Sequence, residues 1–178
     1  MEHIPYTLGS WLDKNIGSLD WVLSQTRETL DFLRFNGIIH FDCHHGNILT
    51  DGDKIYLTDF GLLLDQSFSL TKRELAFCEE NKYYDYGEFL SGLGDHIYSK
   101  YSNLSKSRKE KLIRHCGLVD EINLRHIKIV LPENIDQISA SGLIKLNAQY
   151  VDKAAKYSSI IGLMNEFFFG MFQNNRKN

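Results

Sequence analysis

One short segment in the first half of the chain, residues 40–61, most limits what this sequence can fold into. It reads HFDCHHGNILTDGDKIYLTDFG. Two β-type runs within it, Ile48–Thr50 and Ile55–Leu57, are joined through Asp51-Gly52, which is a strong hairpin signal. The chain must therefore double back here, and the residues that flank the hairpin are expected to meet.

Three polar side chains, Asp42, Asn47 and Asp59, are spaced around this predicted hairpin. The hairpin folds Asp59 back toward Asn47, so two residues that are distant in sequence can share one metal site. Mg²⁺ prefers oxygen ligands, which Asn47 and Asp59 supply. Phosphoryl transfer also needs a carboxylate that orients the attacking hydroxyl and accepts its proton, and Asp42 suits that role. The pattern predicts the base and the Mg²⁺ ligands of a phosphotransferase.

The segment resembles the catalytic loop and metal-binding Asp-Phe-Gly of the protein-kinase-like superfamily, H-x-D-x-x-x-x-N followed by D-F-G. The resemblance implies a kinase-like C-terminal lobe with ATP and Mg²⁺ as cofactors, which transfers the γ-phosphate to a hydroxyl acceptor. It also implies a scaffold role for His40, packed against the Asp-Phe-Gly backbone and hydrogen-bonded to it. Asp85 is implied to start a central helix and to hold the catalytic loop from beneath.

Two residues of the loop depart from regulated protein kinases. Phe41 takes the place of the Arg that pairs with a phosphorylated activation loop, so we expect no switch of that kind. His44 stands where the protein-kinase Lys contacts the transferred phosphate. A His there resembles the H-G-D-x-H-x-x-N loop of aminoglycoside and choline phosphotransferases, and we assign His44 to the catalytic set beside Asp42. These features favour a small hydroxyl-bearing acceptor, with a protein substrate still open.

The sequence upstream of the loop lacks the parts of that superfamily that clamp ATP. No G-x-G-x-x-G loop occurs, and Lys14 is the one lysine that precedes Asp42. Residues 1–12 resemble the family's hinge and the helix that follows it, which implies that backbone groups of Glu2 and Ile4 meet adenine. We therefore expect this chain to supply the catalytic lobe only and to be inactive alone. An N-lobe would come from a longer chain or a separate polypeptide.

Two functions stay open at this point. The first is a phosphotransferase of which this chain is the catalytic lobe, and retention of Asp42, Asn47 and Asp59 favours it. The second is a non-catalytic kinase-like binding or scaffold module, a pseudoenzyme inactive without an N-lobe, and the missing clamp favours it. A zinc site at residues 43–45 is disfavoured, because adjacent residues of an extended loop point in different directions. We expect Cys43 to be a packed thiol.

Outside the hairpin the pattern is helical, which predicts a mainly α fold with a small β-hairpin element, an α+β class. The predicted helices lie at residues 18–36, 71–80 with a Thr71–Glu74 capping box, 85–98, 105–115, and one or two within 145–173. Core candidates in the last segment are Ile160, Ile161, Met164, Phe167 and Phe168. We assign one domain, residues 1–178, with a hinge-like start (1–12), the catalytic loop and metal-binding hairpin (38–61) and a helical body (85–178).

Composition narrows the setting in which such a domain works. The net charge of −3 argues against a nucleic-acid partner and against a polybasic membrane patch. No apolar run approaches the roughly 20 residues needed to span a bilayer. Three scattered cysteines without a C-x-x-C pair indicate reduced thiols. We expect a cytoplasmic protein with neither nucleic-acid nor membrane partners.

Overall fold

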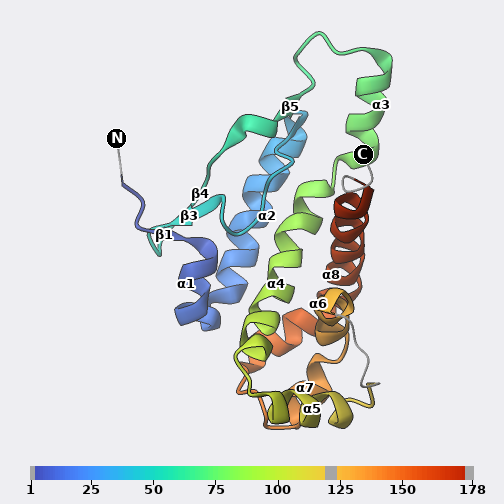
Figure 1. The fold of residues 1–178 in the computed structure, drawn as a ribbon. Coiled ribbons are helices and arrows are strands. Elements are labelled where there is room, and N and C mark those ends of the chain that lie inside the picture. Colours follow the sequence, from blue (N-terminus) through green and yellow to red (C-terminus); the bar gives the residue numbers. More distant parts are fainter. Residues whose placement is uncertain (1–2, 119–123, 175–178) are drawn as a thin grey trace. The chain divides into compact units, whose positions relative to one another are not determined.

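The computed structural model describes residues 3–118 and 124–174, and its fold is shown in Figure 1. The chain is mainly helical with a few short antiparallel strands, which confirms the predicted α+β class. It divides into two compact units, residues 1–89 and 90–178. The assignment of all 178 residues to one domain stays a prediction.

The first unit carries every strand of the described chain and the catalytic-loop segment. Its elements, in chain order, are β1 (Tyr6–Thr7), α1 (Leu8–Asn15), the 3-10 turn η1 (Ile16–Ser18), α2 (Leu19–Phe35), β2 (Ile38–Ile39), β3 (Ile48–Thr50), β4 (Ile55–Leu57), the 3-10 turn η2 (Phe60–Leu62), β5 (Leu64–Asp65) and α3 (Lys72–Asn81). Helix α4 (Tyr84–Ser102) begins in this unit and continues into the second.

The predicted hairpin is confirmed. Strands β3 and β4 pair antiparallel, with Ile48 opposite Leu57 and Thr50 opposite Ile55, and β1 pairs with the other edge of β3. Asp51 shapes the turn, because its Oδ1 accepts the backbone N–H groups of residues 53 and 54. A separate two-stranded sheet joins β2 to β5. The two sheets fix the segments on either side of residues 40–47.

Helix α2 forms where the sequence predicts it. Leu19, Val22, Leu30 and Leu33 are buried as expected, whereas Leu23 is half-buried. Ser18 precedes the helix, but its side chain makes no capping hydrogen bond. The helix ends at Phe35 with Asn36 as its C-terminal cap, and Gly37 follows with a φ of +71°. This left-handed turn directs the chain into β2 and so into the loop that starts at His40.

The predicted capping box of α3 is confirmed. The Thr71 Oγ1 accepts the Glu74 N–H at 3.3 Å, and the Glu74 Oε2 accepts the Thr71 N–H at 2.7 Å. These reciprocal bonds satisfy donors that the first helical turn leaves without intrahelical partners. They fix the start of the helix that follows the Asp-Phe-Gly segment.

The second unit is helical in its described residues. After α4 it contains α5 (Lys106–His115), α6 (Leu124–Glu133), α7 (Ile135–Ala140) and α8 (Ala148–Asn174). Helix α6 packs on α8, and the Tyr150 hydroxyl of α8 donates to the Leu93 carbonyl of α4 at 2.7 Å. Helices α6 and α7 lie within the predicted helical body (85–178), in a stretch for which no separate helix is predicted. Pro132 lies inside α6, one residue before its end.

Helix α8 places its core candidates on two different faces. Ile161 and Met164 are buried, as predicted, and Phe168 is half-buried. The prediction is wrong for Ile160 and Phe167, which are exposed. At about 100° per residue, positions 160 and 167 fall on a different side of the helix from position 161. Within residues 3–118 and 124–174, no helix combines the length and apolar character that crossing a membrane requires.

Replacing Gly37 with Ala tests the turn that leads into the loop. A Cβ there would lie 3.1 Å from the Gln66 Cβ, in addition to the left-handed backbone. We expect Gly37→Ala to lower the free energy of unfolding by about 2 kcal/mol. Gly142 also has a positive φ, but nothing lies within 4 Å of its built Cβ. Gly142→Ala should therefore cost about 1 kcal/mol, and equal losses in urea unfolding would contradict the account of Gly37.

Candidate active site

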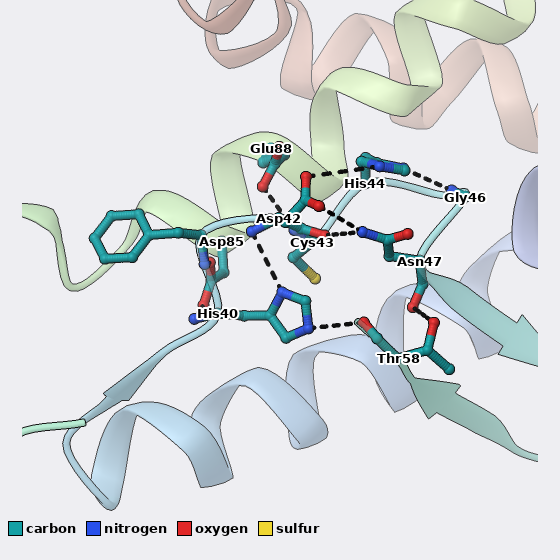
Figure 2. Close-up of polar contacts among 10 residues, drawn as sticks. His40, Asp42, Cys43, His44, Gly46, Asn47, Thr58, Asp85 and Glu88 are labelled. Carbon is teal, nitrogen blue, oxygen red and sulfur yellow. Dashed lines mark hydrogen bonds and ion pairs between the residues drawn. The ribbon is translucent and has the colours of Figure 1, made fainter. Parts of the chain in front are cut away.

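The catalytic-loop backbone is held by one buried carboxylate, as Figure 2 shows. The Asp85 Oδ2 accepts the His40 N–H at 2.8 Å, and its Oδ1 accepts the Phe41 N–H at 2.9 Å. Burial raises the pKa of Asp85, while the two donated amide hydrogen bonds oppose that rise. Asp85 lies in the first turn of α4, so the expected support of the loop by this residue is confirmed.

The scaffold role expected for His40 is also confirmed. Its ring is fully buried, and its Nδ1 accepts the Asp42 N–H at 3.3 Å. The Nε2 lies 3.0 Å from the Thr58 carbonyl oxygen, so the ring proton belongs on Nε2, where it donates to that carbonyl. The edge of the ring also contacts Phe60, at 4.7 Å between centroids. His40 thereby joins the start of the loop to the Asp-Phe-Gly segment.

Asn47 orients the Asp42 side chain. The Asn47 Nδ2 donates to the Asp42 Oδ2 at 2.7 Å and to the Asp42 backbone carbonyl at 3.0 Å. Both hydrogens of the amide group are used in this way. The Asn47 Oδ1 is therefore the atom of this side chain with ligand capacity. The sequence predicts a metal-binding role for Asn47, and the structure adds this contact to the Asp42 carboxylate.

His44 lies beside Asp42 on the exposed side of the loop. Its Nδ1 accepts the Gly46 N–H at 2.9 Å, which leaves the ring proton on Nε2. That Nε2 is 3.6 Å from the Asp42 Oδ1 and 51% of the side chain is exposed. A Cβ at Gly46 would lie 2.7 Å from the His44 ring, so glycine is required for this orientation. The two predicted catalytic residues thus lie side by side.

Asp59 lies two residues after the end of β4. Strand β4 pairs with β3, which begins directly after Asn47. The Asn47 carbonyl accepts both the N–H and the hydroxyl of Thr58, at 2.9 and 3.0 Å. This ties the residue before Asp59 to Asn47. Asp59 itself is exposed and has a left-handed backbone, with a φ of +59°. Such a conformation costs a non-glycine residue about 1–2 kcal/mol.

The donor set fits the metal that the sequence predicts. Asn47 offers a carbonyl oxygen and Asp59 an exposed carboxylate, and both are ligand types that Mg²⁺ takes. Their role as ligands stays a prediction. In the described parts of the chain, no group of three or more His, Cys, Asp or Glu residues could hold a metal ion.

Cys43 is a packed thiol. Its side chain is fully buried, and burial, together with the negative charges of Asp85, Glu88 and Asp42, raises the pKa of the thiol. A thiol held in its neutral form is a poor nucleophile. Its backbone N–H donates to the Glu88 Oε2 at 2.7 Å. Cys43 therefore serves the loop through its backbone and its packing.

Glu88 is a residue of this site that sequence reasoning missed. It lies one helical turn after Asp85 on α4, and it is 6% exposed. Burial raises its pKa to about 7, with a further contribution from the nearby Asp42 and Asp85 carboxylates. The spacing of three residues between two acidic side chains in an otherwise uncharged helical turn is the signal that could have found it.

Of the two predicted hinge residues, Ile4 lies within the described part of the chain. Glu2 lies outside the described residues. Ile4 is half-buried and comes two residues before β1. Their predicted contact with adenine stays a prediction.

Comparison with known proteins points to kinases. Serine/threonine-protein kinase PKH2 of Saccharomyces cerevisiae is 41% identical to this chain over 80 residues, which cover 40% of this chain and 7% of the yeast protein. The matched part is thus a small fraction of that relative's length. No protein-family model matches the chain, and no solved structure matches it. The similarity supports a kinase-like relationship for this chain.

Glu88→Gln tests the electrostatics under the loop. The folded-state pKa of about 7 lies above the ordinary glutamate value of 4.5, so the folded state binds this proton more tightly. The resulting stabilisation is present at pH 4 and is lost as the pH rises through 7. Gln keeps a carbonyl acceptor for the Cys43 N–H but does not ionise. Between pH 5 and pH 8, Glu88→Gln should gain about 2 kcal/mol of unfolding free energy relative to the wild type.

Urea unfolding of both proteins at the two pH values measures this difference. Glu80→Gln, at an exposed position of α3, is the matched control and should show no such change. A Glu88→Gln protein whose stability difference from wild type is the same at pH 5 and pH 8 would contradict the assignment.

Proposed function

We propose that this chain is the catalytic half of an ATP- and Mg²⁺-dependent phosphotransferase, which transfers the γ-phosphate to a hydroxyl acceptor. The observation that carries the proposal is the pair of hydrogen bonds from the Asn47 amide to Asp42. They fix a half-buried carboxylate beside a second side chain whose Oδ1 has ligand capacity. The partial similarity to a yeast serine/threonine-protein kinase supports the same class of reaction.

Asp42 acts as the base in this proposal. Its Oδ2 is held by Asn47, whereas its Oδ1 faces the His44 side of the loop. A hydroxyl that donates to this carboxylate is oriented for attack on phosphorus. As the acceptor oxygen forms its bond, Asp42 takes the hydroxyl proton, the bond to the β-phosphate oxygen breaks, and ADP leaves.

Asn47 and Asp59 would hold Mg²⁺ through the Asn47 Oδ1 and the Asp59 carboxylate. When bound, the ion supplies neutralisation of the phosphate charge. Thr58 keeps the two ligand-bearing segments together, because its N–H and its hydroxyl both donate to the Asn47 carbonyl. The residues that clamp the nucleotide are expected on an N-lobe outside this sequence, on a longer chain or a separate polypeptide.

His44 would contact the transferred phosphate through its Nε2–H. The bond from Gly46 to the Nδ1 fixes which nitrogen carries the proton, and the ring is half-exposed beside Asp42. An imidazole N–H donor in place of a flexible lysine favours a small hydroxyl-bearing acceptor. Protein hydroxyls are the alternative class.

The test is release of ADP from Mg-ATP by the natural full-length protein, with amino alcohols and with Ser- or Thr-containing peptides as acceptors. We expect Asp42→Asn to lower the rate at least about 100-fold, because it removes the base while keeping an isosteric side chain. Nucleotide affinity should stay within about two-fold, since Asp42 contacts the acceptor rather than the nucleotide.

Asp53→Asn, on the exposed turn of the β3–β4 hairpin, is the matched control and should keep the wild-type rate. Wild-type turnover by Asp42→Asn would rule out this role for the residue. The acceptor class that accelerates ADP release in the wild type but not in the variant identifies the substrate class.

A non-catalytic binding or scaffold module is the second candidate. It is favoured by the lack of a G-x-G-x-x-G loop and by the single lysine upstream of Asp42. Phosphoryl transfer depends on positioning and charge neutralisation, which such groups supply. Calorimetric titration of the full-length protein with Mg-ATP separates the two, because the absence of nucleotide binding would favour the scaffold.

A further inference from the structure

The ring of Phe41 contacts two helices at once. It stacks on Phe77 of α3, with centroids 5.6 Å apart and planes 26° from parallel, and it lies 5.3 Å from the Tyr84 ring at the start of α4. Phe77 lies 36 positions further along the chain, beyond the Asp-Phe-Gly segment. We call these three residues the aromatic cluster.

The backbone of Phe41 is held in a conformation that its residue type disfavours. Its φ is +60°, in the left-handed region, and it is one of two such non-glycine residues in the described parts of the chain. The Asp85 Oδ1 accepts its N–H at 2.9 Å. Since Tyr84 and Asp85 are adjacent, the first turn of α4 contacts both the ring and the backbone of Phe41.

Asp42 is the next residue along the chain. The contacts that hold Phe41 therefore also orient the peptide group that joins Phe41 to Asp42. A phenylalanine with a positive φ relaxes toward ordinary backbone angles unless surrounding contacts prevent it. Aromatic pairs of this geometry supply such contacts. Loss of the Phe77 ring would therefore loosen Phe41 and, through it, Asp42.

We propose that Phe77 and Tyr84 are positioning residues that hold the Asp42 carboxylate through Phe41. The inference rests on the proposed role of Asp42 and extends it to the control of the site. Packing of α3 against the loop takes the place that a charged contact to a phosphorylated segment would occupy. The position of Asp42 then depends on an apolar contact that requires no phosphorylation.

Amide hydrogen exchange in the full chain tests the structural part. We expect Phe77→Ala to speed exchange at the Phe41 N–H about five-fold. Phe77→Tyr keeps the ring, and the 48% exposure of Phe77 leaves room for a hydroxyl, so its exchange should stay within about two-fold of wild type. Leu75→Ala is the matched control. Leu75 is 43% exposed and lies two residues away, on another side of α3.

Unchanged exchange at Phe41 in Phe77→Ala, with the fold intact by circular dichroism, would overturn the proposal. If Phe77→Ala does not fold, Phe77→Leu provides the same comparison. It keeps apolar bulk without the ring and should speed exchange at least about two-fold. Equal acceleration in Leu75→Ala would also overturn it, because the effect would then belong to α3 in general.

Turnover of the natural full-length protein tests the functional part. Phe77→Ala should lower kcat about five-fold and leave the KM for ATP within about two-fold, with kcat restored in Phe77→Tyr. A residue that served only the stability of α3 would leave kcat of the folded protein unchanged. If no variant, wild type included, transfers phosphate, the proposed function fails while the exchange result still decides the role of the cluster.

Discussion

The rest of the site depends on the two hydrogen bonds that the Asp85 carboxylate accepts from consecutive backbone N–H groups. These donors belong to His40 and Phe41, and neither has a place in a regular strand or helix. A buried polar group without a partner is costly, so the carboxylate and the two amides need each other. Asp85 fixes where the loop begins. The His40 ring then links the start of the loop to Thr58 by a hydrogen bond, and the Asn47 amide links the end of the loop to Asp42.

Negative charge accumulates under this loop. Asp85 and Glu88 are both buried on α4, and the nearby Asp42 and Asp85 carboxylates make ionisation of Glu88 less favourable. Backbone N–H groups of the loop stabilise part of this charge by hydrogen bonding. Those of His40 and Phe41 donate to Asp85, and that of Cys43 donates to Glu88. Burial is the main cause of the raised pKa of Glu88, and the two nearby carboxylates add to it. Groups whose ionisation is strained in this way gather at functional sites more often than elsewhere.

The sequence predicted what depends on local pattern. The hairpin follows from Asp51-Gly52, and the scaffold role of His40 and the support from Asp85 follow from the resemblance of the loop. Contacts set by tertiary packing were missed, since nothing local links Phe77 to Phe41 or Glu88 to Cys43. The same holds in the second unit. There the face that α8 buries depends on its packing against α6. No separate helix is predicted from the sequence at the position of α6. Metal and nucleotide ligands stay predictions because they concern atoms beyond the chain.

The Asp85 carboxylate accepts the backbone N–H groups of both His40 and Phe41. Scalar couplings across hydrogen bonds, measured by NMR between backbone nitrogens and side-chain carboxyl carbons, test this claim directly. We expect two such couplings that converge on the Asp85 carboxyl carbon, one from the His40 nitrogen and one from the Phe41 nitrogen. A spectrum in which either amide couples to a different acceptor, or in which both exchange freely with water, would contradict it.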